Sequence, residues 1–467
     1  MNAKSGRRHG RSGRKGGLNS ETAFWLLAGF VALVMLMGGG SRADIASNGP
    51  LRALAAVLLA VGVWYQTRTS LRRVLVPLLA LLALALLIAL QLVPLPPDVW
   101  GSLPGREPFV RLGELAGIPD AWRPLTFSPM KTGNSLAALI VPLAALLMVS
   151  LLDDEHWRNL PWVFIAAGVA SALFGMAQIL LPGAGGLYLY DVTNTGSAVG
   201  LFSNRNHNAM FLAVALLLCV LRLERARRGP LENEVLAAGL AALVILAGIL
   251  VNASRSGLVG LGLVGLIFAV RALLHWREQA RAGQSGVPRR VWAGGLVGLL
   301  SLGLVAMFAA LGRSPAIARL LQEDPGQDLR VQALPTVLAM LRDFQPFGAG
   351  FGAFEYAFFV REPEAMLGER YLNNVHNDWL QFPLEGGVPA ILLALVLLGL
   401  FVSRCWQLVR DRAHGGAMLR NAVAGALVLL LLMIGSLVDY PLRTPSIMVL
   451  AVVAAAMLFK PIADSRH

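Results

Sequence analysis

Long apolar runs separated by short polar links dominate the sequence. Runs of roughly 17–25 residues, long enough to span a bilayer, recur along nearly the whole chain. They are continuous stretches of Leu, Ala, Val and Gly, whereas the strands of a membrane barrel would alternate apolar and polar positions over about ten residues. The pattern predicts an all-α polytopic membrane protein. About twelve transmembrane helices are expected, at residues 22–38, 51–66, 74–94, 134–152, 161–181, 208–222, 235–252, 257–273, 291–311, 388–403, 421–437 and 445–460.

Three polar segments interrupt this pattern, at residues 95–133, 182–207 and 312–387. The last is the longest, and loops held by a rigid scaffold often carry function. Within it, residues 329–342 place apolar side chains at a helical spacing, which predicts an amphipathic helix lying on or near the membrane. Those side chains are Val331, Leu334, Val337, Leu338 and Leu341.

A glycine-rich run, Phe347–Phe354, follows Pro346 in the same segment. Glycine allows backbone segments to pack closely, so a tight turn is expected here. No strand precedes the run, which excludes a dinucleotide-binding loop.

Composition and charge fix the class and the orientation. Hydrophobic residues make up 56% of the chain and charged residues only 14%, against roughly 25% in soluble domains. Most of the 40 Lys and Arg residues fall in the N-terminal tail and in alternate short links. Because such residues favour the cytoplasmic side, both termini are expected there and the 312–387 loop outside. The net charge of +13 is therefore mainly a determinant of topology, and nucleic-acid binding is not expected.

The predicted organisation has four parts. Residues 1–20 form a basic cytoplasmic tail, and residues 21–311 hold helices one to nine with the outer loops 95–133 and 182–207. Residues 312–387 form the large periplasmic loop, and residues 388–467 hold the last three helices and a short cytoplasmic tail.

Metal binding is not expected from the cysteines or histidines. Cys219 and Cys405 lie in or at the ends of predicted helices, and the chain has no CxxC motif or Cys/His metal spacing. The sequence therefore predicts neither a metal nor another cofactor.

Three arginines on the outer face are candidates for anion binding. Arg255 interrupts two apolar helices in the turn Ser254-Arg-Ser-Gly257. An arginine at this depth either snorkels to lipid phosphate or faces an internal cavity that binds an anion. Arg330 opens the predicted loop helix and Arg205 precedes the sixth helix; each alone is also compatible with a solvated charge. Together they favour phosphate recognition, because guanidinium groups bind phosphate in a bidentate manner.

His376 is the candidate base. It lies where the large loop returns to the bilayer, beside Asn377, and a neutral imidazole can take a proton from a sugar hydroxyl near pH 7. Asp378, Glu385 or Asp439 could orient its ring. The rival histidine, His207, is interpreted as part of a capping cluster at the start of the sixth helix.

Taken together, these segments resemble the O-antigen ligase/polymerase superfamily. The matching pieces are Gly200–Ala209, Ser254–Gly257, Arg330 with Pro346–Phe354, and His376–Gln381 followed by Glu385–Gly387. Their order and spacing cover roughly residues 120–405, with a core at about 200–405. Leu334 departs from the Trp that is common in such proteins, a difference that affects packing.

The resemblance implies a GT-C-like fold and a metal-independent glycosyltransferase in the bacterial inner membrane. Its donor would be an undecaprenyl-pyrophosphate-linked glycan at the periplasmic face. Arg255 and Arg330 would stabilise the leaving pyrophosphate, and His376 would act on the acceptor hydroxyl. Arg205, Asp439 and Asn377 are further candidates for substrate binding.

Several functions remain compatible with the sequence. The acceptor could be lipid A-core, another lipid-linked chain or a protein hydroxyl, which correspond to a ligase, a polymerase and a protein O-oligosaccharyltransferase. A polysaccharide transporter or flippase would place charged or broken helices near the bilayer midplane, whereas the polar residues here gather on one face. A non-catalytic scaffold for envelope assembly would not need His376 or Arg255.

Overall fold

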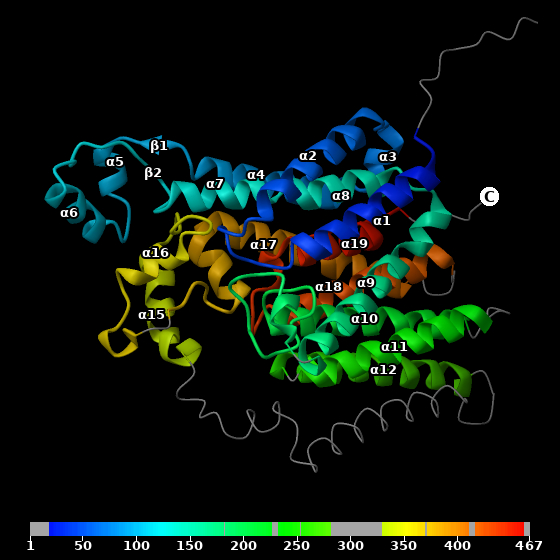
Figure 1. Ribbon diagram of the computed structural model, residues 1–467. Coiled ribbons are helices and arrows are strands. Elements are labelled where there is room, and N and C mark those ends of the chain that lie inside the picture. The colour runs from blue at the N-terminus through cyan, green and yellow to red at the C-terminus, as the bar shows by residue number, and fades with distance from the viewer. Residues whose placement is uncertain are drawn as a thin grey trace, which may run out of the picture.

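The computed structural model describes residues 18–181, 183–226, 232–252, 254–281, 329–368, 371–410 and 416–461. The predicted helix at 291–311, residues 312–328 of the large loop and residues 1–17 of the basic tail lie outside these ranges. The described chain is a bundle of long helices with shorter elements gathered at one end (Figure 1).

The bundle consists of the apolar segments that the hydrophobic pattern predicts. Eight of the described helical spans are long and apolar enough to cross a membrane, and three further apolar helices are shorter. In chain order the bundle helices are α1 (Ser20–Met37), α2 (Asn48–Trp64), α4 (Leu75–Leu90), α7 (Pro129–Ala138) continued by α8 (Ile140–Ser150), α9 (Asp154–Leu180), α10 (Arg205–Ala226), α11 (Glu232–Asn252), α12 (Arg255–Arg281), α17 (Asp378–Arg410), α18 (Ala417–Gly435) and α19 (Pro445–Phe459). Each predicted span within the described residues overlaps one of them.

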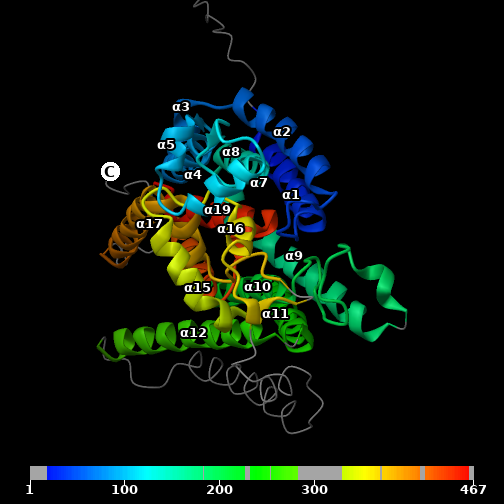
Figure 2. The same cartoon turned by 90° about the vertical axis from the view of Figure 1, so that its left-hand side faces the viewer.

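The shorter elements lie in the links. They are α3 (Arg68–Arg73), β1 (Pro94–Leu95), α5 (Pro97–Gly101), α6 (Glu107–Leu115), β2 (Arg123–Pro124), η1 (Ala184–Leu187), α15 (Leu329–Asp343), α16 (Phe354–Phe359), η3 (Glu364–Met366) and η5 (Pro441–Arg443). Strands β1 and β2 pair antiparallel, with Pro94 opposite Pro124. Seen along the bundle, α15 and α16 lie over the ends of the long helices (Figure 2).

Helix α10 is the most enclosed of the long spans. In its most apolar window 78% of the residues are buried, against 17% in α12 and α17. Its neighbours α9, α11 and α12 pack along it (Figure 1). A polar residue in the first turn of α10 therefore lies inside the protein rather than on its surface.

The two ends of the described chain meet at one end of the bundle. Ser20 at the start of α1 hydrogen-bonds His156 (Oγ to Nδ1, 2.9 Å), and the Lys460 ammonium contacts Asp154 at 2.5 Å. The polar segments before α7, before α10 and before α17 lie at the other end (Figure 1).

The amphipathic helix predicted in the large loop is confirmed as α15. The buried face of α15 differs in part from the predicted apolar face, because the buried side chains are Ala333, Val337 and Met340. Val331 and Leu334 are exposed instead.

The start of the following bundle helix was predicted wrongly. Helix α17 begins at Asp378 rather than near residue 388, and Gly387 is a kink inside it (φ 64°, ψ −159°). The first turns of α17 bury Gln381 and Glu385. Glu385 is paired with Arg443, which lies far along the chain, so the polar sequence of these turns does not show that they are helical.

Candidate functional site

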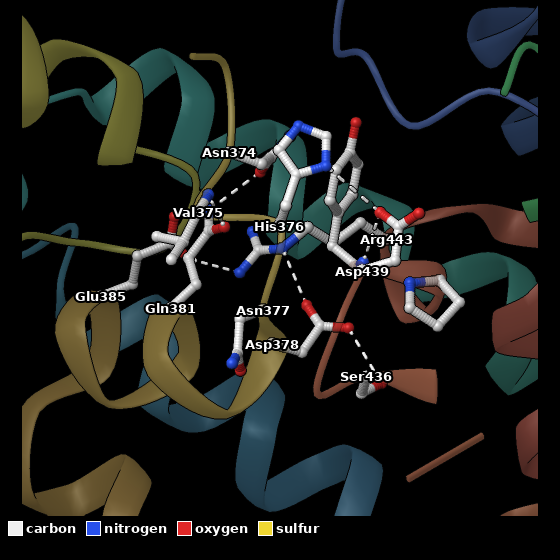
Figure 3. A network of polar contacts seen from close by, with 12 residues as sticks. Asn374, Val375, His376, Asn377, Asp378, Gln381, Glu385, Ser436, Asp439 and Arg443 are labelled. Carbon is white, nitrogen blue, oxygen red and sulfur yellow. Dashed lines mark hydrogen bonds and ion pairs between the residues drawn. The ribbon is translucent and has the colours of Figure 1, made fainter. Parts of the chain in front are cut away.

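Four segments that are distant in sequence converge at the loop-bearing end of the bundle. They are the residues before α17, the link between α18 and α19, the first turn of α10 and the start of α15. Figure 3 shows the His376 ring, Asp439 and the charged residues of α17 close together.

His376 is held in an unusual backbone conformation. Its φ of 58° is the one positive value of a non-glycine residue in the described chain. The flanking residues are fixed by α17: the Val375 amide donates to Gln381 Oε1 at 2.8 Å, and Asn377 Oδ1 accepts from the Leu380 amide at 3.2 Å. A non-glycine residue in this region is strained, and such strain is common at functional sites.

Asn377 therefore caps α17 with its side-chain oxygen. That contact accounts for its presence beside His376, and its predicted role in substrate binding stays a prediction.

Asp439 is the carboxylate that faces the histidine. Its Oδ1 lies 3.4 Å from His376 Nδ1 and 3.7 Å from Nε2 of His207, and it accepts the Tyr440 amide at 2.9 Å. The residue is 3% exposed. Burial alone would raise the pKa of the Asp439 carboxyl, but the two imidazoles together hold this pKa below its usual value. Of the three carboxylates that could orient His376, the structure selects Asp439.

Arg330 lies next to this pair. Its Nη1 donates to the carbonyl oxygen of Val438 at 3.4 Å, one residue before Asp439. Burial lowers the pKa of His376 below the ordinary 6.5, Asp439 opposes the shift, and the positive charge of Arg330 adds to it. The lowered pKa of His376 favours its neutral form, which is the form that a general base requires.

Arg205 and Arg255 begin the adjacent helices α10 and α12. The two helix starts are tied together, because Asn252 Nδ2 donates to the Arg205 carbonyl at 3.0 Å and Ser254 Oγ donates to Asn206 Oδ1 at 2.6 Å. Arg205 lies two residues before His207, which faces Asp439. The start of α12 is therefore fixed to the start of α10, whose His207 faces Asp439.

Arg443 is a charged residue of this region that the sequence prediction missed. Its Nε lies 3.2 Å from Asp378 Oδ1, and its Nη2 lies 2.9 Å from Oε2 of Glu385, which is fully buried. Gln381 Nε2 donates to Glu385 Oε1 at 2.9 Å, and Ser436 Oγ lies 3.2 Å from Asp378 Oδ2 (Figure 3). This network joins the first turns of α17 to the α18–α19 link, and so holds His376 opposite Asp439.

A signal for Arg443 was present in the sequence. It is an arginine in a short link between two apolar helices, the same feature that marked Arg255.

The interpretation of His207 as part of a cap is corrected by the structure. The side chain of Asn204, rather than His207, accepts from the backbone at the start of α10, at 2.8 Å from the Asn206 amide. His207 points inward and is 0% exposed. Because α10 is the most enclosed helix, a side chain in its first turn can reach the centre of the site.

The glycine-rich run supports the kink in α17, as the predicted tight turn requires. The amides of Ala349 and Gly350 donate to the carbonyls of Leu384 and Glu385 at 3.0 and 2.9 Å. A Cβ on Gly387 would lie 2.2 Å from the Pro346 carbonyl oxygen. The two segments approach too closely for a side chain at this point.

No group of three or more His, Cys, Asp or Glu side chains in the described ranges is arranged to hold a metal ion. The polar region instead combines one imidazole–carboxylate pair, a second imidazole and several guanidinium groups.

The fold and this region define a helical, multi-pass membrane protein with a buried polar site at one end of its bundle. A family model described as O-antigen ligase matches residues 240–395. This match confirms the resemblance to the O-antigen ligase superfamily. It includes Arg255, Arg330 and His376, whereas Arg205, His207, Asp439 and Arg443 lie outside it. No curated protein matches the chain significantly.

Proposed function

We propose that the protein is a membrane glycosyltransferase of the O-antigen ligase type. It moves a glycan from undecaprenyl pyrophosphate to a hydroxyl acceptor at the periplasmic face of the bacterial inner membrane. The observation that carries the proposal is the position of His376, whose Nδ1 lies 3.4 Å from Asp439 Oδ1 and which has Arg330 beside it.

His376 acts as the base. With Nδ1–H directed at Asp439, the lone pair of Nε2 accepts the proton of the acceptor hydroxyl. Figure 3 shows this second ring nitrogen pointing away from Asp439. The Asp439 carboxylate then stabilises the imidazolium, and the two groups work as an oriented base.

The arginines act on the leaving group. The acceptor oxygen forms a bond to the anomeric carbon, and the bond from that carbon to the pyrophosphate oxygen breaks. The electron pair passes to the pyrophosphate, whose charge Arg255 and Arg330 stabilise, with Arg205 at the neighbouring helix start. Such stabilisation by preorganised cations is a large contribution in an enclosed site.

The preferred acceptor is the hydroxyl of a lipid A-core, which makes the enzyme a ligase of lipopolysaccharide assembly. A polymerase or a protein O-oligosaccharyltransferase would use the same donor chemistry. The polar region lies at one end of the bundle, which agrees with transfer at the membrane surface rather than with transport through the bilayer.

The test is transfer by the purified protein in lipid vesicles that hold a polyprenyl-pyrophosphate-linked glycan. Lipid A-core, a second lipid-linked glycan and a protein acceptor are supplied in separate reactions. His376→Ala and Arg255→Ala should each abolish transfer, and the accepted substrate identifies the type of enzyme. His156→Gln, which changes a histidine at the opposite end of the bundle, is the matched control and should transfer normally. Normal transfer by both site variants contradicts the proposed function.

A further inference from the structure

His207 stands on the other side of Asp439 from His376. Its Nε2 lies 3.7 Å from the same carboxylate oxygen that faces His376 at 3.4 Å. The Tyr440 ring meets both imidazoles edge to face, with centroid distances of 4.9 and 4.7 Å. A histidine from the first turn of α10 and one from the segment before α17 therefore share one carboxylate and one aromatic ring.

The polar atoms of His207 have little else to bind. Its side chain is fully enclosed, and neither ring nitrogen makes a hydrogen bond within the part of the chain that the structure describes. The other oxygen of Asp439, Oδ2, is likewise buried without such a bond. Burying unsatisfied polar groups is costly. A purely structural position in the enclosed helix α10 would be served better by an apolar side chain.

Charge balance limits what this arrangement can do. One carboxylate neutralises one imidazolium, and Arg330 already brings a positive charge to the same place. Two protonated histidines would leave an excess of buried positive charge. A proton on one imidazole therefore disfavours a proton on the other.

We propose that His207 is a positioning residue for the transfer reaction, which competes with His376 for Asp439 and thereby keeps His376 neutral and aligned as a base. His207 directs its Nε2–H, and His376 its Nδ1–H, at the same Asp439 oxygen, at N–O distances of 3.7 and 3.4 Å. When Nε2 of His376 takes the proton of the acceptor hydroxyl, His376 becomes a charged imidazolium. Asp439 then interacts more strongly with His376 than with His207.

The charged and titratable groups that face His376 come from four elements. Asp439 and Tyr440 belong to the α18–α19 link, Arg330 to α15, and His207 to α10. Asp378 on α17 is bound by Arg443. Replacing His207 leaves the oriented His376–Asp439 pair and the leaving-group cation Arg330 in place.

This inference rests on the proposed function, and the pH dependence of transfer tests it. Two variants are compared with the wild type in the vesicle assay. His207→Phe keeps an aromatic ring against Tyr440 but removes the donor, and His207→Gln keeps an uncharged N–H donor. Without the competitor, Asp439 stabilises the His376 imidazolium more strongly, so the acid limb of the rate profile moves to higher pH.

The expected shift is larger for the phenylalanine variant than for the glutamine variant. For His207→Phe the ratio of the rate at about pH 6 to the rate at about pH 8 should fall about three- to tenfold relative to wild type. Glutamine restores part of the ratio. A loss of packing alone would lower the rate equally at every pH and leave the acid limb in place.

An unmoved acid limb in His207→Phe overturns the inference. If that variant does not fold, the same decision rests on His207→Gln, whose limb must move in the same direction. The proposed function is tested separately: it fails when His376→Ala still transfers glycan, whatever the His207 variants do.

Discussion

Two histidine–aspartate pairs lie at opposite ends of the helical bundle. At one end His156 Nδ1 lies 2.8 Å from Asp153 Oδ1, and the His156 amide also donates to that oxygen, so the pair forms the N-cap of α9. At the other end His376 lies 3.4 Å from Asp439. The shorter contact is the one between His156 and Asp153, which have no role in the proposed reaction.

The surroundings distinguish the two pairs. The Asp153 side chain is 55% exposed, and its carboxylate has an ordinary structural role as the cap at the start of α9. Asp439 is buried between two imidazoles, and His376 has a strained backbone. A His–Asp contact is thus no sign of function by itself. Burial together with unsatisfied polar atoms and neighbouring cations separates a candidate site from a cap.

The largest expected difference between the two ends is the effect of removing the carboxylate charge. Asp439→Asn removes the group that orients His376 and stabilises its charged form, so glycan transfer should fall about a hundredfold or more. Asp153→Asn is the matched control: asparagine caps a helix as well as aspartate does, so transfer should stay near wild type. Equal rates in the two variants would show that the buried pair has no special role.

A second contrast concerns the ion pairs of the two ends. Arg443 binds two carboxylates in the interior, whereas Lys460 contacts Asp154, whose side chain is 69% exposed. Arg443→Met leaves the carboxylates of Asp378 and Glu385 in the interior without their cation and should cost about 3–5 kcal/mol of stability. Lys460→Met should cost at most about 1 kcal/mol, because Asp154 remains solvated.

Thermal unfolding of the two variants in detergent measures this difference. Arg443→Lys keeps the positive charge but cannot bind both carboxylates in the same geometry. Its melting temperature should therefore fall between those of the two methionine variants. A melting temperature for Arg443→Met equal to that of Lys460→Met would mean that the network does not hold α17 to the α18–α19 link.

The apolar pattern was sufficient for the bundle and for α15, because each of those helices follows from residues that are near one another in sequence. Arg255 could be singled out because it interrupts two apolar runs, and His376 because it lies where the large loop returns to the bilayer. Their roles in the site stay predictions. The packing of the glycine-rich run was expected for the same local reason.

The failures have a common cause. The first turns of α17 are polar, and Glu385 is buried there only because Arg443, far along the chain, balances its charge. His207 resembles a capping residue until the enclosure of α10 is known. Both depend on tertiary contacts that a window of sequence does not contain.

The smallest expected contrast is in the response of the two histidines to pH. Burial lowers the pKa of His376 below 6.5, and Arg330 adds to the shift. Because the base must be neutral, the midpoint of the acid limb, where transfer falls to half its plateau value, should lie below pH 6.5. Protonating His376 also costs more in the folded than in the unfolded chain. The stability that it contributes is therefore present above 6.5 and is lost as the pH falls from 6.5 toward its folded pKa.

Rate and melting temperature measured across this range separate the two effects. Arg330→Gln removes a positive charge near His376, so its acid limb should move to higher pH while the rate falls because the leaving group loses a cation. His156→Gln should leave the limb unmoved, since His156 lies at the far end of the bundle. If the acid limb moved equally in both variants, the titrating group would lie outside the site. The two histidine–aspartate pairs would then not differ in the proposed way.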